Sequence, residues 1–162
     1  MAISKQKKIE TVEKADNIVK KSQSVVFVTF KGLKVTDTTV MRKELRKNSV
    51  GYRVIKKTLL ERALSGNKVA GKVPQMDGEI AVVFGDDLIA PAREVYNFQK
   101  KFKNQVVIVG GIFEGKYMNK AEMLSIATIP SLQTLHAQFV NLINSPIQGL
   151  VMALNAIAEK KQ

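Results

Sequence analysis

Residues 31–63, KGLKVTDTTVMRKELRKNSVGYRVIKKTLLERA, form the stretch around which the fold and the charge of this 162-residue chain are organised. The stretch holds ten of the 26 lysines and arginines and three acids. A solvated helix face is the usual explanation of a charge run, but this excess is too one-sided for it. A folded surface with so much positive charge indicates a polyanionic partner. Apolar residues recur between the charges, and we expect these to pack inward: Val40, Leu45, Val50, Tyr52, Val54, Leu59, Leu60 and Ala63.

The overall composition limits the class of protein. With 45% hydrophobic residues, the chain can bury the core of one domain, with or without an appendage. The absence of cysteine excludes disulfides and thiolate metal sites. The N-terminal MAISKQKKIE lacks the apolar segment of a secretory signal. No uninterrupted run of about 18 apolar residues occurs, so we expect no membrane contact and a basic cytoplasmic protein.

The charge is unevenly distributed along the chain. Residues 1–64 carry +10 of the formal +12, whereas residues 130–162 contain two bases and one acid. Such asymmetry suggests separate tasks for the parts of a chain. We therefore expect a polyanion-binding domain over residues 1–128 and a distinct tail over residues 129–162.

Hydrophobic periodicity and turn residues predict an alternation of helices and strands. Ser4 is the expected N-cap of the first helix, and Thr36 or Asp37 that of the second. We expect helices over 4–21, 37–47, 57–64 and 89–102, and strands over 24–30, 52–55, 79–84 and 104–109, the last ended by Gly110 and Gly111. The order strand, helix, strand occurs twice. It predicts an α/β sandwich with a ferredoxin-like βαβ-βαβ core, in which helices cover one face of a four-stranded sheet.

The C-terminal part is predicted to be helical. Asn119 and Glu122 form a capping-box pattern that opens a short helix ending at Ala127. From Leu132 onward, apolar residues recur at spacings of three and four, which predicts an amphipathic helix of about 30 residues and about 45 Å. Pro146 should kink this helix or split it in two. A domain of this size cannot cover such a helix, so part of its apolar face should be buried against another chain.

Three candidate catalytic motifs have simpler explanations. Residues 110–116, GGIFEGK, match a phosphate-binding loop, but Tyr117 stands where a magnesium-binding hydroxyl is needed, and we predict a turn between strands. Asp86 and Asp87 suit a helix N-terminus. His136 is the only histidine and has no carboxylate within four residues. We therefore expect no enzymatic activity, no cofactor, no metal and no small-molecule substrate.

The basic residues are the stronger functional signal. Lysine ammoniums, arginine forks and the free N–H groups at the start of a helix together make a phosphate-binding surface. Few exposed aromatic residues lie among them, which favours recognition of a folded RNA by its backbone and shape over stacking on single-stranded bases. The candidate RNA-binding residues are Lys5, Lys7, Lys8, Lys31, Gly32, Lys34, Arg42, Arg46, Lys56, Lys57, Thr58 and Arg62.

Six segments, in their order and spacing, resemble the bacterial large-subunit ribosomal protein L10 family over nearly the whole chain. They are Gly32-Leu-Lys-Val35, Leu45-Arg46, Tyr52-Arg-Val-Ile-Lys-Lys-Thr-Leu59, residues 110–116, Ile129-Pro-Ser131, and Pro146 followed by Gly149-Leu-Val151. Lys34 and Lys57 stand where the family has Thr and Asn. Both add charge, and Lys57 can only donate hydrogen bonds, whereas Asn also accepts them.

The resemblance implies two tasks in the cytoplasmic ribosome. The N-terminal domain would bind large-subunit rRNA at the stalk base, beside ribosomal protein L11. The C-terminal helix would anchor dimers of the acidic stalk protein L7/L12, which recruit translational GTPases. We expect two dimers, one on each side of Pro146, because a tail ending at Gln162 has no room for a third stripe. The first stripe is Leu132, Leu135, Phe139, Leu142 and Ile143, and the second is Ile147, Leu150, Val151, Leu154 and Ile157.

The residues also allow an alternative. The chain could be a free-standing basic RNA-binding or ribosome-maturation protein that self-associates through its C-terminal helix. The two functions differ in whether the tail pairs with itself or stays exposed until an acidic partner is added.

Overall fold

The computed structural model of the chain describes residues 5–66, 69–71, 73–76, 78–102 and 105–160. Two compact units, Met1–Ile129 and Pro130–Gln162, make up the chain. The second unit contains the helix α6 (Leu132–Glu159). The first contains α1 (Lys5–Lys21), β1 (Ser24–Phe30), α2 (Val35–Lys47), β2 (Gly51–Ile55), α3 (Lys57–Gly66), β3 (Ile80–Gly85), α4 (Ala90–Lys101), β4 (Val106–Phe113), β5 (Lys116–Asn119) and α5 (Lys120–Ala127).

The sheet has the strand order β2-β3-β1-β4-β5, and each neighbouring pair is antiparallel. β1 and β2 are therefore parallel to each other, with β3 inserted between them. β3 and β4 are likewise parallel, with β1 inserted between them. Two βαβ units split in this way form the ferredoxin-like core, which confirms the predicted fold class. The hairpin partner β5 makes this a five-stranded sheet, where we predicted four strands.

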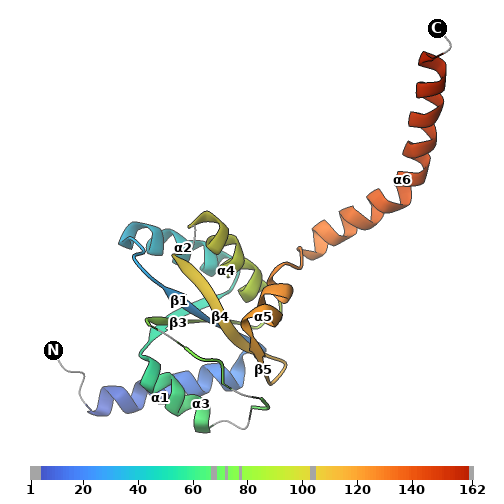
Figure 1. The fold of residues 1–162 in the computed structure, drawn as a ribbon. Coiled ribbons are helices and arrows are strands. Elements are labelled where there is room, and N and C mark those ends of the chain that lie inside the picture. Colours follow the sequence, from blue (N-terminus) through green and yellow to red (C-terminus); the bar gives the residue numbers. More distant parts are fainter. Residues whose placement is uncertain (1–4, 67–68, 72, 77, 103–104, 161–162) are drawn as a thin grey trace. The chain divides into compact units, whose positions relative to one another are not determined.

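Helices cover both faces of the sheet, so the expectation of helices on one face was incomplete. α2 and α4 pack on one face, and α1 and α3 lie together on the other (Figure 1). Val26 and Val28 of β1 belong to the first core, and Val25 and Phe27 to the second. Because β1 is covered on both faces, residues 25–28 form a continuous apolar run, VVFV, instead of alternating with polar residues.

β4 continues through Gly110 and Gly111 to Phe113, so the predicted end of this strand was wrong. Phe27 pairs with Gly110 but Val28 pairs with Ile108, which makes Val109 the extra residue of a bulge. The bulge moves Ile112 to the α1 and α3 face, although Ile108, four residues earlier, lies in the other core. A Cβ on Gly110 would lie 2.7 Å from the Met118 oxygen, so close strand packing explains the glycine.

Several local predictions need correction. The N-cap of α2 is Lys34, not Thr36 or Asp37, and its side chain makes no capping hydrogen bond. Val40 and Val54 are 49% and 46% exposed, so they do not pack inward as expected. Ser4 and Asn104 lie outside the described residues. The capping box of α5 is confirmed, since the Asn119 N–H donates to the Glu122 Oε2 atom at 2.8 Å.

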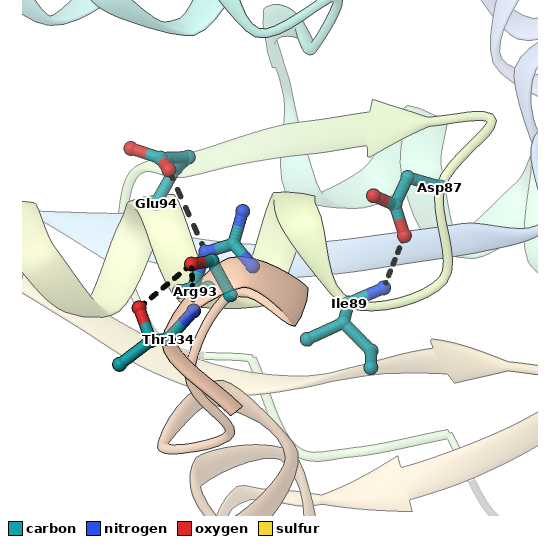
Figure 2. A network of polar contacts seen from close by, with 6 residues as sticks. Asp87, Ile89, Arg93, Glu94 and Thr134 are labelled. Carbon is teal, nitrogen blue, oxygen red and sulfur yellow. Dashed lines mark hydrogen bonds and ion pairs between the residues drawn. The ribbon is translucent and has the colours of Figure 1, made fainter. Parts of the chain in front are cut away.

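α6 is a single helix that contains Pro146, and its ribbon changes direction near its middle (Figure 1). Proline lacks an N–H and its ring clashes with the preceding turn, which bends a helix. The helix begins with a capping contact, in which the Thr134 N–H donates to the Ser131 Oγ atom at 3.3 Å (Figure 2). None of the residues of α6 is buried.

Candidate RNA-binding surface and partner-binding helix

One group of predicted residues meets at the end of the sheet where the parallel strands β1 and β2 finish. Lys56, Lys57 and Thr58 line an open cavity of about 510 Å³ together with Gly78 and Glu79, and we call it the strand-end pocket. Lys57 and Thr58 begin α3, whose first N–H groups favour anions. Lys57 already interacts with another residue of the chain, so it is not a free cation. The pocket thus combines two lysines, a hydroxyl and a helix N-terminus beside one acid.

The connection from β1 to α2 brings three more predicted residues to the same end of the sheet. A Cβ on Gly78 would lie 3.9 Å from the Lys31 Cε atom, so the Lys31 side chain runs beside the strand-end pocket. Gly32 has a φ of 66°, a left-handed conformation that favours glycine, and open space surrounds it. Lys34 is exposed at the N-cap of α2. These residues extend the positive surface around the pocket.

A second group lies along the outer edge of β2, which is an edge strand of the sheet. A groove of about 550 Å³ runs there, and we call it the β2-edge groove. Among the described residues that line it are three arginines and no acid. The lining residues are Ile18, Arg42, Arg46, Val50, Gly51, Tyr52, Arg53, Val54 and Phe84. Val54 also lines the strand-end pocket, so the two sites adjoin.

Arg42 is held in this groove by an aromatic contact. Its Cζ atom lies 5.2 Å from the centre of the Tyr52 ring, a cation–π distance. Burial raises the pKa of the Tyr52 phenol, and the positive charge of Arg42 opposes this shift in part. The contact ties α2 to β2 and fixes the position of one guanidinium.

The predicted residues on the outer helices remain separate from these two sites. Lys7 and Lys8 are exposed on α1, Arg62 is exposed on α3, and the side chain of Lys5 lies outside the described structure. α1 packs against α3, and Thr58 and Arg62 are one turn apart on α3. Arg53 was missed by the sequence analysis. The sequence did contain a sign of its position, because a charged residue within a short strand indicates a strand at the edge of a sheet.

The motifs that resembled catalytic sites have structural roles. Residues 110–116 form the end of β4, a two-residue turn and the start of β5. Glu114 and Gly115 have φ values of 49° and 75°, which is the pattern of a type I′ hairpin turn. Asp87 caps the chain before α4, where its Oδ1 atom accepts the Ile89 N–H at 3.0 Å (Figure 2). His136 is exposed on α6, and no cluster of three potential metal ligands occurs among the described residues.

All ten residues of the two predicted stripes of α6 are exposed, from Leu135 at 41% to Leu142 at 71%. On an ideal helix, with about 100° per residue, each stripe covers an arc of about 120° or less, and the second is rotated by about 60° from the first. Two stripes that point in different directions fit two separate partners better than one long partner. Val140 and Met152 are also exposed, outside the stripes.

By length and composition alone, α6 is long and apolar enough to cross a membrane. This finding differs from the expectation drawn from the absence of a continuous apolar run. Polar residues interrupt the helix throughout, among them Gln133, Asn141, Asn144, Gln148 and Asn155. They concentrate the apolar residues into stripes, which is the pattern of a helix that binds a partner along one side.

The fold and these surfaces define a class of protein: a basic α/β domain joined to an uncovered amphipathic helix, built to work within a larger assembly. The model of the family "Ribosomal protein L10" matches residues 3–100. The chain is 36% identical to the large ribosomal subunit protein uL10 of Burkholderia cenocepacia and of Paraburkholderia phymatum, and 35% identical to that of Burkholderia mallei. Each similarity covers 100% of this chain and 98% of the relative.

The chain belongs to the ribosomal protein L10 family of the large ribosomal subunit. It is therefore a non-enzymatic protein of the translation apparatus, located in the cytoplasmic ribosome. This confirms the resemblance and the predicted absence of catalysis, which the structural roles of residues 110–116 and Asp87 had already suggested.

Proposed function

We propose that residues 1–128 bind large-subunit rRNA at the stalk base, beside ribosomal protein L11, and that residues 129–162 anchor two dimers of the acidic stalk protein L7/L12. One observation carries this proposal, the different character of the two parts of the chain. Residues 1–129 hold 24 basic and 13 acidic residues. In contrast, α6 has no charged residue before Glu159, and none of its residues is buried. Such a division fits one surface for a polyanion and another for an apolar partner helix.

The strand-end pocket supports the RNA part of the proposal. RNA in duplex form is recognised mainly through phosphates and 2′-hydroxyls, which are hydrogen-bond acceptors on a charged backbone. Lys31, Lys56 and Lys57 present ammonium donors, and the start of α3 adds N–H groups. Lys34 extends this surface, and the exposed Lys7, Lys8 and Arg62 offer further RNA contacts outside the pocket.

The two stripes of α6 support the stalk part. Each stripe spans about three turns, enough to pair with a short helical segment of a partner. Burying five large apolar side chains contributes roughly 7–15 kcal/mol before the costs of association and ordering. Tight binding at each site is therefore physically reasonable.

A reconstitution experiment tests both parts. The full chain is mixed with a bacterial large-subunit rRNA transcript and with excess acidic stalk protein, and the complexes are analysed by gel shift and native mass spectrometry. We expect RNA binding and two stalk dimers per chain. Truncation after Asn144 should leave RNA binding intact and reduce the dimers to one. Three dimers, or no loss upon truncation, would refute the two-site assignment.

The same preparation tests self-association, which the exposure of α6 also allows. Sedimentation of the chain alone should give a monomer, whereas a stable dimer that excludes the stalk protein would support the alternative function. The chain can also be offered lipid vesicles together with the stalk protein. If it binds the vesicles and not the stalk protein, α6 is a membrane-binding helix, which its length and apolar composition allow.

A further inference from the structure

We propose that the β2-edge groove holds an unpaired nucleotide of the bound RNA, and that Arg53 is a direct contact to it. The inference rests on the proposed RNA-binding function and adds a mode of recognition to it. It also differs from the sequence-based expectation, which favoured recognition of a folded RNA by its backbone and shape over stacking on single-stranded bases.

The size and place of the groove favour a single strand. Its volume of about 550 Å³ lies in the range of pockets that hold small ligands. A double helix presents a wide, shallow minor groove and cannot enter a cleft of this size, whereas an unstacked nucleotide can. The groove adjoins the strand-end pocket at Val54, so one RNA can place its paired part on the pocket and an unpaired residue in the groove.

The arginines reach the groove from both faces of the sheet. Arg53 pairs in register with Val82, which belongs to the core under α1 and α3. Arg42 and Arg46 come from α2 on the opposite face. A guanidinium binds phosphate oxygens through two parallel N–H groups. Three of them around one strand edge can hold the phosphates on either side of an extruded base.

The groove also offers surfaces for a base. Val50, Val54 and Phe84 form an apolar part of its lining. Arg42 lies over the Tyr52 ring, and an arginine fixed in this way provides a planar group on which a base can stack. The groove thus combines phosphate contacts with a stacking surface, which is the combination that unpaired nucleotides require.

Two other roles for the same residues are less well supported. Charged residues on an edge strand prevent unwanted strand pairing, but that role needs only Arg53 and leaves Arg42 and Arg46 on α2 unexplained. An acidic peptide could add to the β2 edge as a further strand. RNA is favoured because the groove adjoins the strand-end pocket at Val54, and the lysines lie in that pocket.

The test uses the full chain and a bacterial large-subunit rRNA transcript, with three readouts: affinity, protection of bases from a reagent that modifies unpaired bases, and ultraviolet cross-links mapped to peptides. We expect a cross-link to the peptide that contains Tyr52 and Arg53. Arg53→Ala should weaken binding about tenfold and expose the protected base. Arg53→Lys should keep most of the salt dependence but lose the base protection, because an ammonium lacks the planar fork.

Controls separate this inference from the proposed function. Lys57→Ala should weaken binding but keep the base protection, and Lys100→Ala, an exposed change on α4, should alter neither. Equal thermal midpoints will show that each variant is folded. If Arg53→Ala binds like the wild type while Lys57→Ala is weakened, the groove inference is wrong and RNA binding stands. If the wild type binds no rRNA, both fail. The inference would also be wrong if Arg53→Ala abolished the binding of an acidic peptide and left the binding of RNA unchanged.

Discussion

β1 and α6 are both apolar, yet their surroundings are opposite. Five of the seven residues of β1 are buried, whereas none of the 28 residues of α6 is. Within one chain, β1 has helices above and below it and strands on both sides, so its apolar residues meet complementary ones. α6 meets no such surface within its own unit. Apolar content therefore predicts burial, but the rest of the chain decides whether the covering surface is internal or belongs to a partner.

A matched pair of phenylalanines gives the largest expected contrast. Phe27 of β1 is 0% exposed and Phe139 of α6 is 64% exposed. Phe27→Ala should lower the free energy of unfolding by about 3–5 kcal/mol because it leaves a cavity in the core. Phe139→Ala should change it by less than about 0.5 kcal/mol. Urea unfolding followed by circular dichroism measures both, and equal losses would show that α6 is packed within the folded chain.

The two halves of α6 should act independently in binding. Phe139→Asp places a charge in the first stripe and Leu154→Asp places one in the second, and each should remove one stalk dimer because a buried unpaired charge is costly. Met152→Asp is the control, since Met152 is 71% exposed and lies outside both stripes. Native mass spectrometry counts the dimers. Loss of both dimers from a single substitution would mean that the stripes form one site.

Salt concentration should affect RNA binding by the α/β domain more than stalk-protein binding by α6, although this effect is smaller than the two above. The logarithm of RNA affinity should fall linearly with the logarithm of salt, since cation release drives binding to phosphates. Replacing Arg46 and Lys57 together with alanine should reduce the slope by about 1.5 and weaken binding roughly 10–100-fold at physiological salt. Binding of the stalk protein to α6 should change little over the same range. An RNA affinity that is indifferent to salt would contradict the electrostatic assignment.

The smallest expected effect is that of alkaline pH on stability. It should lower the free energy of unfolding of the α/β domain and leave α6 unaffected. Burial raises the pKa of Tyr52 above its usual value of about 10, so the unfolded chain loses this proton at a lower pH than the folded one. Stability is then fully present below pH 10 and falls as the pH rises from there through the folded-state pKa. Tyr52→Phe should flatten this fall in part, because Tyr117 is shifted in the same direction. An unchanged profile in chemical unfolding would show that Tyr52 is solvated.

Local patterns accounted for most of the fold. The limits of β1 and the capping box of α5 followed from residue types, and the split βαβ order followed from the alternation of elements. The second helical layer was not foreseen, because the helices were expected to cover one face of the sheet only. The passage of β4 through two glycines was missed for a different reason: glycine usually ends a strand, and here close packing explains it, because a Cβ on either glycine would lie within 2.7 Å of a backbone oxygen.

The candidate sites were only partly predictable. Residue type and spacing suggested which lysines and arginines are candidates for RNA binding, but not their division between the strand-end pocket and the β2-edge groove. That division depends on which strand is at the edge of the sheet, which is a property of the topology. Arg53 was overlooked because it lies between Tyr52 and Val54 in a strand expected to face the core. The stripes of α6 were visible from periodicity alone, and all ten of their residues are exposed.

The exposure of α6 also means that its helical form depends on little besides its own backbone. Isolated helices are marginal in water, and most helices in proteins are stabilised by packing. Gly149, three residues after Pro146, has open space around it and adds conformational freedom within the second stripe, between Ile147 and Leu150. Part of the binding free energy must then be spent on ordering the chain. Gly149→Ala should lower that entropy cost by about 1 kcal/mol and tighten binding at the second stripe without adding a contact. With Pro146 and Gly149 near the middle of α6, each half can thus become ordered separately, when its own partner arrives.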